Sequence, residues 1–169
     1  ERNVAIGQNT LVANTTASDN TAVGKSAMAA NTSGARNTAV GSYALAANTT
    51  GVDNVSLGYY ALDVNTTGGE NIAIGNHALG TQTSGGHMNT AVGHEAMKGN
   101  TTGDSNTAIG FKALLDNTSA NNNTAMGHYA MLRNTTGTNN VSVGYLAMED
   151  NTTGHSNVAI GMEAHKNAT

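Results

Sequence analysis

The chain has 169 residues, of which 21 are Gly, with no Pro, Cys or Trp and a single Phe. It lacks the large side chains that usually fill a globular core of this length, so it must bury small residues repetitively instead. Only 11% of the residues are charged, the net charge is -4 and the basic residues are scattered singly, which argues against nucleic-acid binding. The apolar runs are far shorter than the roughly 20 residues of a membrane span, so we expect no membrane insertion.

One unit of 17 residues recurs ten times along the chain. It reads N-[TVI]-[AS]-[VILM]-G-x-x-A-[LM]-x-x-N-T-[TS]-G-x-x, and we number its residues as positions 1 to 17. In chain order the units begin at Asn3, Asn20, Asn37, Asn54, Asn71, Asn89, Asn106, Asn123, Asn140 and Asn157. Every step is 17 residues except the step of 18 between Asn71 and Asn89. This periodicity predicts a single repeat domain over residues 1–169, an all-β parallel β-solenoid of about ten coils. Because Glu1 falls inside a repeat, we expect an excerpt of a longer fibre.

Positions 1 to 5 open each unit and are typical of a short strand that ends at a Gly with positive φ. Position 4 is always large and apolar, and position 3 is always Ala or Ser. Neighbouring residues of a strand point to opposite faces. We therefore expect position 4 to fill the interior of the solenoid, and position 3 to be small because a second copy of the chain packs against the outer side. The Leu or Met at position 9 is expected to join position 4 in the interior.

Positions 6 to 11 form the second segment, and two structures remain open for it. Stretches such as residues 94–99 (HEAMKG) have a helix-forming composition, so the segment is either a strand or one helical turn per coil. Asn at positions 1 and 12 suits turns with left-handed backbone, and its amide can bond an identical Asn one coil away, which predicts Asn ladders. The extra residue of the longer unit is expected to bulge outward between Gly85 and Met88.

The motif N-x-A-V/I-G resembles the head repeats of YadA-like trimeric autotransporter adhesins, as at residues 3–7, 71–75 and 157–161. The continuation A-L-x-x-N-T-T-G is also similar to repeats of phage tail fibres and of large exported proteins of aquatic bacteria. This resemblance implies surface attachment by a rigid multivalent spacer and a trimeric head, and it supplies no catalytic residue. The unit here is a few residues longer and carries the additional N-T-T-G turn.

No constellation of side chains breaks the repeat in the way that a catalytic site would require, so we expect no enzyme, no metal site and no cofactor. The carboxylates Asp104, Asp116, Glu149, Asp150 and Glu163 lie in solvated columns, and the six His residues do not form an H-x-H spacing. The G-x-x-x-x-G-K-[ST] phosphate loop and the G-G-x-G-x-D calcium repeat are absent.

Two sets of residues are candidate sites of contact or modification. Aromatic rings in solvated columns can stack on sugars or pack at a subunit boundary, and the candidates are Tyr43, Tyr59, Tyr60, Tyr129 and Tyr145. The N-T-[TS] sequence matches the N-glycosylation acceptor pattern and equally suits a turn. The candidate acceptors are Asn14, Asn31, Asn48, Asn65, Asn100, Asn117, Asn134 and Asn151.

The function expected from the sequence is a structural and adhesive repeat module of an extracellular fibre or cell-surface appendage, which associates with itself as a homotrimer. A cell-surface or glycan target is a possible partner. The alternatives are a solenoid surface that binds carbohydrate or ice directly, and the shaft of a phage tail fibre that recognises a host. Ice-binding solenoids present regular T-x-T arrays on strands, whereas the Thr pairs here precede Gly in an expected turn.

Overall fold

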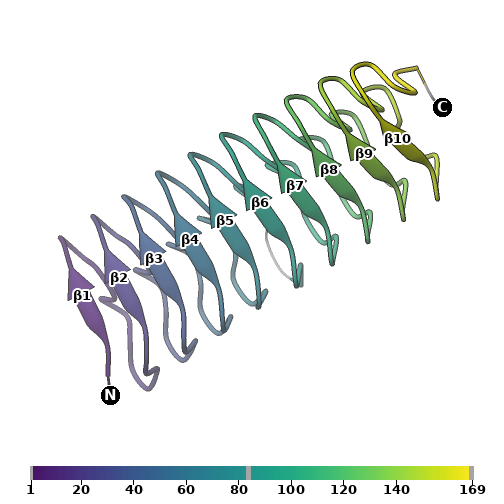
Figure 1. The fold of residues 1–169 in the computed structure, drawn as a ribbon. Helices are drawn as coiled ribbons and strands as arrows, with labels where there is room; N and C mark the ends of the chain where they lie inside the picture. Colours follow the sequence, from purple (N-terminus) through teal and green to yellow (C-terminus); the bar gives the residue numbers. More distant parts are fainter. Residues whose placement is uncertain (1, 83–84, 168–169) are drawn as a thin grey trace.

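The computed structural model describes residues 2–82 and 85–167, which form one β-solenoid (Figure 1). Each coil contributes one strand of three residues: β1 (Val4–Ile6), β2 (Thr21–Val23), β3 (Thr38–Val40), β4 (Val55–Leu57), β5 (Ile72–Ile74), β6 (Thr90–Val92), β7 (Thr107–Ile109), β8 (Thr124–Met126), β9 (Val141–Val143) and β10 (Val158–Ile160). They make one parallel sheet in chain order, and the described residues contain no helix. The two ends of the chain therefore lie at opposite ends of a rod (Figure 1). The predicted fold class is confirmed.

Equivalent positions of successive coils lie directly beside one another. In the pair β2–β3, for example, Thr21 lies opposite Thr38 and Ala22 opposite Ala39. This register makes every position of the unit a column along the rod. Among the described residues, no helix is long and apolar enough to cross a membrane.

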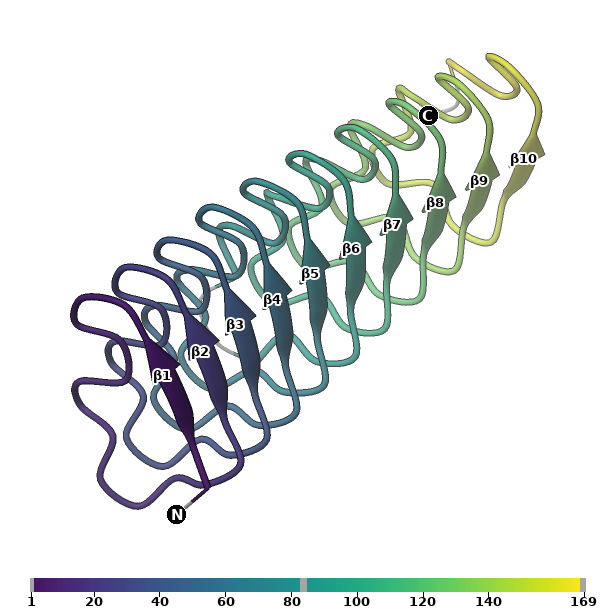
Figure 2. The same cartoon turned by 60° about the vertical axis from the view of Figure 1, so that its left-hand side comes forward.

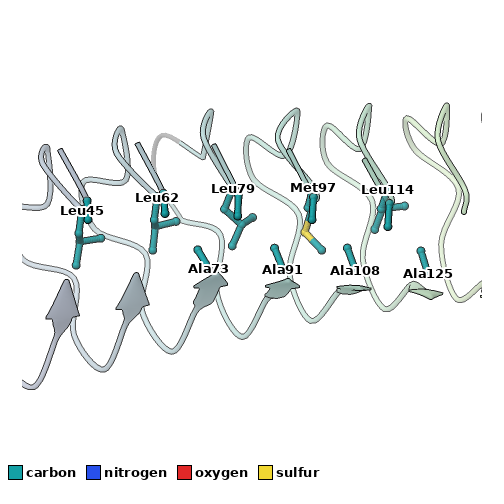
Figure 3. Packing of buried hydrophobic residues seen from close by; sticks show 14 of the residues in the cluster. Leu45, Leu62, Ala73, Leu79, Ala91, Met97, Ala108, Leu114 and Ala125 are labelled. Carbon is teal, nitrogen blue, oxygen red and sulfur yellow. The ribbon is translucent and has the colours of Figure 1, made fainter. Parts of the chain in front are cut away.

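Positions 3, 8 and 9 form the interior of the solenoid. The prediction that position 4 lies in the interior was wrong. The Ala column at position 3 and the Leu and Met column at position 9 are fully buried in the central coils, and Leu79 lies over Ala73 in Figure 3. Position 4 lies on the outer face, where Leu57 is 44% and Met126 is 41% exposed. Because strand residues alternate between faces, position 2 shares that outer face.

Position 3 is thus small for a reason inside each coil, and not because a second chain approaches it. In the central coils, one Leu or Met from the far wall fills the space above each Ala, so a larger residue at position 3 would overpack the coil. Where position 3 is Ser, its hydroxyl donates to a carbonyl of the same coil: Ser56 to Ala61 and Ser142 to Ala147, both at 2.7 Å. The small columns at positions 3 and 8 therefore cannot form the surface of a trimer.

Positions 6 to 11 form neither a strand nor a helical turn. Left-handed backbone recurs at positions 7, 9 and 17 of the coils, as in Tyr43 (φ 60°), Leu45 (φ 52°) and Asp53 (φ 59°). Such residues reverse the chain sharply. Positions 7 and 9 follow the strand of their own coil, whereas position 17 lies just before the next strand, and Figure 2 shows the tight turns that connect successive strands. No β-branched residue occupies these three positions in any coil, because branching at Cβ clashes in left-handed backbone. The Asn residues at positions 1 and 12 do not adopt it.

The Gly at position 5 has positive φ in every coil, as predicted, with values from 125° to 141°. A Cβ atom built on Gly41 would lie 2.4 Å from the carbonyl oxygen of Gly58 in the next coil. Side chains are therefore excluded both by the backbone conformation and by the close stacking of the coils.

The 18-residue coil joins its neighbours without loss of register, since Ile74 of β5 pairs with Val92 of β6. The extra residue lies one step earlier than expected, because Gly86 and Met88 keep the bonds of the regular column: the amide of Asn71 donates to the carbonyl of Gly86, and the backbone N–H of Met88 to Gly69. Gly85 is exposed with open space around it, so it bulges outward. The remaining residues between Gln82 and Gly85 lie outside the described part of the chain.

Candidate functional surfaces

Two ladders of buried Asn side chains run inside the rod, as the sequence predicted. In the position-12 ladder, Nδ2 of Asn48 donates to Oδ1 of Asn31 at 2.8 Å and to the carbonyl of Gly51 at 3.0 Å. In the position-1 ladder, Oδ1 of Asn37 accepts from the backbone N–H of Asn54 at 2.9 Å. The buried amides bond the neighbouring coils, except that Oδ1 of Asn151, at the C-terminal end of the position-12 ladder, accepts no hydrogen bond from the described residues. The ladders therefore fix the stacking register from coil to coil.

The candidate glycosylation sites belong to the position-12 ladder. Asn31, Asn48, Asn65, Asn100, Asn117, Asn134 and Asn151 are fully buried, and only Asn14, in the first coil, is partly exposed. The nitrogen that would carry a glycan donates hydrogen bonds within the ladder. A glycan on one of these buried amides requires the coil to open first.

The Thr pairs after this Asn lie in a bend and not on a strand. The first hydroxyl of the pair bonds to the next coil, as Oγ1 of Thr49 does to the carbonyl of Thr66 at 3.0 Å. The second residue is exposed, as at Thr67 and Thr102.

The candidate aromatic residues are brought together with histidines into two stacked ladders, an arrangement that the sequence analysis missed. At position 7, the ring of Tyr60 lies between Tyr43 and His77, with centroid distances of 4.8 and 5.5 Å. At position 6, Phe111 lies between His94 and His128 at 5.5 and 5.0 Å. The spacing of 17 residues between rings, with His counted among them, is the signal that reveals these ladders.

The three other candidate tyrosines extend these ladders. Tyr59 meets Tyr60 edge-on at 4.4 Å, Tyr129 packs against His128 at 4.2 Å, and Tyr145 is tilted against His128 at 5.5 Å. Burial among the rings raises the pKa of the Tyr60 hydroxyl. Because both faces of Tyr60 and of Phe111 are covered by neighbouring rings, these residues present edges to solvent, which is a poor arrangement for stacking on a sugar.

Charged side chains pair between adjacent coils or, as Lys98 and Glu95 do, within one coil, and these pairs are spread along the rod. Arg2 bonds Asp19 at 2.7 Å, Arg36 bonds Asp53 at 2.6 Å, and Arg133 bonds Asp150. The guanidinium groups of Arg2 and Arg36 lower the pKa of Asp19 and Asp53, and the ammonium of Lys98 lowers that of Glu95. Within residues 2–82 and 85–167, no three His, Asp or Glu side chains are placed to hold a metal ion.

One hollow of about 280 Å³ opens beside the 18-residue coil, lined by Thr81, Glu95, Lys98, Gly99, Leu115 and Asp116. Its Lys98 ammonium is held by the Glu95 carboxylate at 2.7 Å, and Thr81 donates to the carbonyl of Lys98. These polar groups satisfy one another, so the hollow offers no convergent set of groups to a ligand.

The outer face of the sheet is the second surface that sequence reasoning missed. Two columns of β-branched and apolar residues, at positions 2 and 4, run along it from β1 to β10, and no position from 1 to 5 carries a charge. Side chains in the middle of this face remain exposed, with Ile72 at 38% and Ile109 at 37%. We call it the sheet face, defined by positions 2 and 4 of every coil.

Comparison with known proteins gives no relative: no family model, no curated protein and no solved structure matches the chain.

Proposed function

We propose that this chain is a structural and adhesive repeat module of an extracellular fibre or surface appendage, where it acts as a rigid multivalent spacer. The observation that carries the proposal is the unbroken continuation of one coil from β1 to β10, with the two chain ends at opposite ends of the rod (Figure 1). A spacer needs length, stiffness and a uniform surface, and all three follow from repetition of one coil.

The stiffness has a specific source in the bonds between coils. At the boundaries between the central coils, the strand bonds are joined by bonds of the two Asn ladders and of the Thr column, such as Thr118 Oγ1 to the carbonyl of Thr135 at 3.0 Å. These bonds lie at different points of the coil, so bending the rod in any direction must stretch some of them. The rod therefore holds its two ends at a fixed distance and orientation relative to each other.

Two observations favour the spacer over direct binding of ice or carbohydrate. No described strand has Thr at both outward positions, so the sheet face holds no T-x-T array. The central rings of the aromatic ladders have both faces covered. A shaft of a phage tail fibre is a spacer of the same kind, and the experiment below separates it from a bacterial appendage.

The experiment that tests the proposal is immunogold electron microscopy with antibodies against the purified chain. Labelled filaments outside intact cells, or on the fibres of virions, are expected. Label confined to the interior of cells would overturn the proposal. Ice-shaping and glycan-array assays of the purified chain are the second arm, and strong activity there would favour the direct-binding alternative.

We also propose that the fibre is multichain, with a homotrimer as the assembly that the resemblance to adhesin heads implies. Joining several rods along a common axis multiplies weak contacts at a tip through avidity.

A further inference from the structure

The starting point is the sheet face, a long uncharged strip. Its position-4 column is apolar in every strand, and its position-2 column is Val or Ile in five strands and Thr in the other five. Ten strands at about 4.8 Å per coil give a length of roughly 48 Å, and two outward columns about 7 Å apart, with their side chains, give a width of roughly 12 Å. The strip is thus about 580 Å², Thr side chains included, which is comparable in size with the largest apolar patches that monomeric proteins expose. Its side chains are β-branched or apolar in all ten strands, as in Val55, Leu57 and Ile74.

The surroundings of the strip match the anatomy of a protein interface. Its centre carries no charge, whereas residues at position 17, just before each coil, include Asp19, Arg36 and Glu70. Specific interfaces combine an uncharged apolar centre with a polar rim in this way. Because the strip is flat, narrow and as long as the rod, only a partner that is itself long and flat can cover it.

We infer that the sheet face is the surface through which copies of this chain associate side by side, lengthwise along the rod. A second copy of the chain presents a strip of the same length and width. Neither strip carries a charge, so the two do not repel each other. Pairing two strips covers about 1,150 Å² in total, which is just under the roughly 1,200 Å² of stable interfaces and above the roughly 1,000 Å² that a biological interface should clear. This inference rests on the proposed multichain fibre and names its contact surface, in place of the small columns at positions 3 and 8.

The test compares two double variants of the whole chain by analytical ultracentrifugation at 10–200 µM. Val55→Lys with Thr107→Lys places two charges on the sheet face. Thr67→Lys with Ser119→Lys places two charges in the same two coils, on exposed bend residues with no interior contact. The unmodified chain and the bend variant are expected to sediment at two or more times 17.1 kDa, and the sheet-face variant at the mass of one chain with an unchanged circular dichroism spectrum. A folded, unmodified chain that stays monomeric at 200 µM overturns the inference, as does a sheet-face variant that still associates.

A second measurement decides the matter if the sheet-face variant does not fold. The chain contains no Cys, so a single introduced thiol reports only its own surroundings. Thr90→Cys lies on the sheet face of β6, and Thr102→Cys lies in the bend of the same coil. Because this coil is central, the β6 thiol meets the central coils of a partner whichever way the two rods run. Rapid oxidative cross-linking of the first variant only is expected, and equal cross-linking of both overturns the inference. If the chain is monomeric while antibodies still label fibres, this inference fails and the proposed function stands.

Discussion

The Nε2 atom of Gln82 donates a 2.9 Å hydrogen bond to the carbonyl oxygen of Gly86, four residues later in the chain. In a regular coil the Asn at this position bonds the carbonyl three residues later, as Asn65 does with Gly68 at 3.0 Å. Oε1 of Gln82 still accepts from Asn100 at 3.2 Å, so the ladder continues. The extra methylene of Gln therefore spans the extra residue of the 18-residue coil.

We expect this compensation to appear as non-additivity between two changes. Gln82→Asn alone removes one of the two side-chain amides that donate to the carbonyl of Gly86, leaving that of Asn71, and shortens the side chain that accepts from Asn100. It is expected to lower the free energy of unfolding by about 1–3 kcal/mol. Deletion of Gly85 alone crowds the longer Gln and is also expected to destabilise. The two together recreate a regular coil and are expected to return to within about 0.5 kcal/mol of the unmodified chain. A double-mutant cycle by denaturant titration measures the coupling, and simple additivity of the two losses would contradict it.

The left-handed backbone at position 9 predicts an unusual sensitivity to side-chain shape. Leu79→Ile keeps volume and hydrophobicity, yet it places a β-branched residue at φ 51°. We expect a loss of about 1–3 kcal/mol in the free energy of unfolding from backbone strain. The matched control is Leu79→Met, which reproduces the residue at the same position in other coils, such as Met97, and is expected to cost under about 1 kcal/mol. Equal costs for Ile and Met would show that the strain is absent.

The Asn ladders predict that replacing an Asn by Asp strongly lowers the free energy of unfolding inside the rod, whereas the same substitution on the surface has little effect. In Asn117→Asp the carboxylate faces Oδ1 of Asn100, to which the amide had donated at 2.7 Å. We expect a loss of about 3–5 kcal/mol at neutral pH, because an unpaired charge is buried. The control is Asn122→Asp, at the exposed position where other coils carry Asp19 or Asp53, with an expected change within about 0.5 kcal/mol. Thermal melts of the two variants make the comparison, and a mild effect of Asn117→Asp would mean that the ladder contributes little.

The repeat length, the parallel strands and the amide ladders were predictable from the sequence, because each depends only on which residues recur at which spacing. For the interior, the sequence predicted the position-9 column correctly and the strand column wrongly. Leu45 and its equivalents were placed correctly, whereas Val40 was placed inside because large apolar residues are usually buried. The small Ala39 takes that place, since the coil is thin and the Leu of the far wall already fills it. The aromatic ladders depend on side-chain directions across coils, which a search for catalytic spacing within one unit does not detect.

Asp63 provides a pH-dependent test. Partial burial raises the pKa of its carboxyl above the ordinary value, so the folded chain is penalised when this group is ionised. That penalty is present at pH 7 and disappears as the pH falls below the ordinary Asp pKa of about 3.9, where both states are protonated. Asp63→Asn is therefore expected to raise the melting temperature by about 1–3 °C at pH 7, with the difference vanishing near pH 3.

The control is Asp53→Asn, for which we expect a change in melting temperature of the opposite sign. Arg36 lowers the pKa of Asp53, so the stability from this pair is present above the ordinary Asp pKa and is lost as the pH falls through the folded pKa. Asp53→Asn is expected to lower the melting temperature slightly at pH 7 and to have no effect at low pH. A melting temperature that falls in both variants at pH 7 would contradict the assignment for Asp63.

Each strand contacts only the strands of the adjacent coils, and the bonds that hold the coils together connect one coil to the next. Tension applied between the two chain ends therefore acts on the boundaries between coils, and the terminal coils, with a neighbour on one side only, open first. A coil of 17 residues that opens replaces about 4.8 Å of rod with roughly 58 Å of extended chain. Each opening lengthens the molecule by about 50 Å while the remaining coils stay folded, so a rod that is stiff at rest is expected to lengthen in discrete steps under tension.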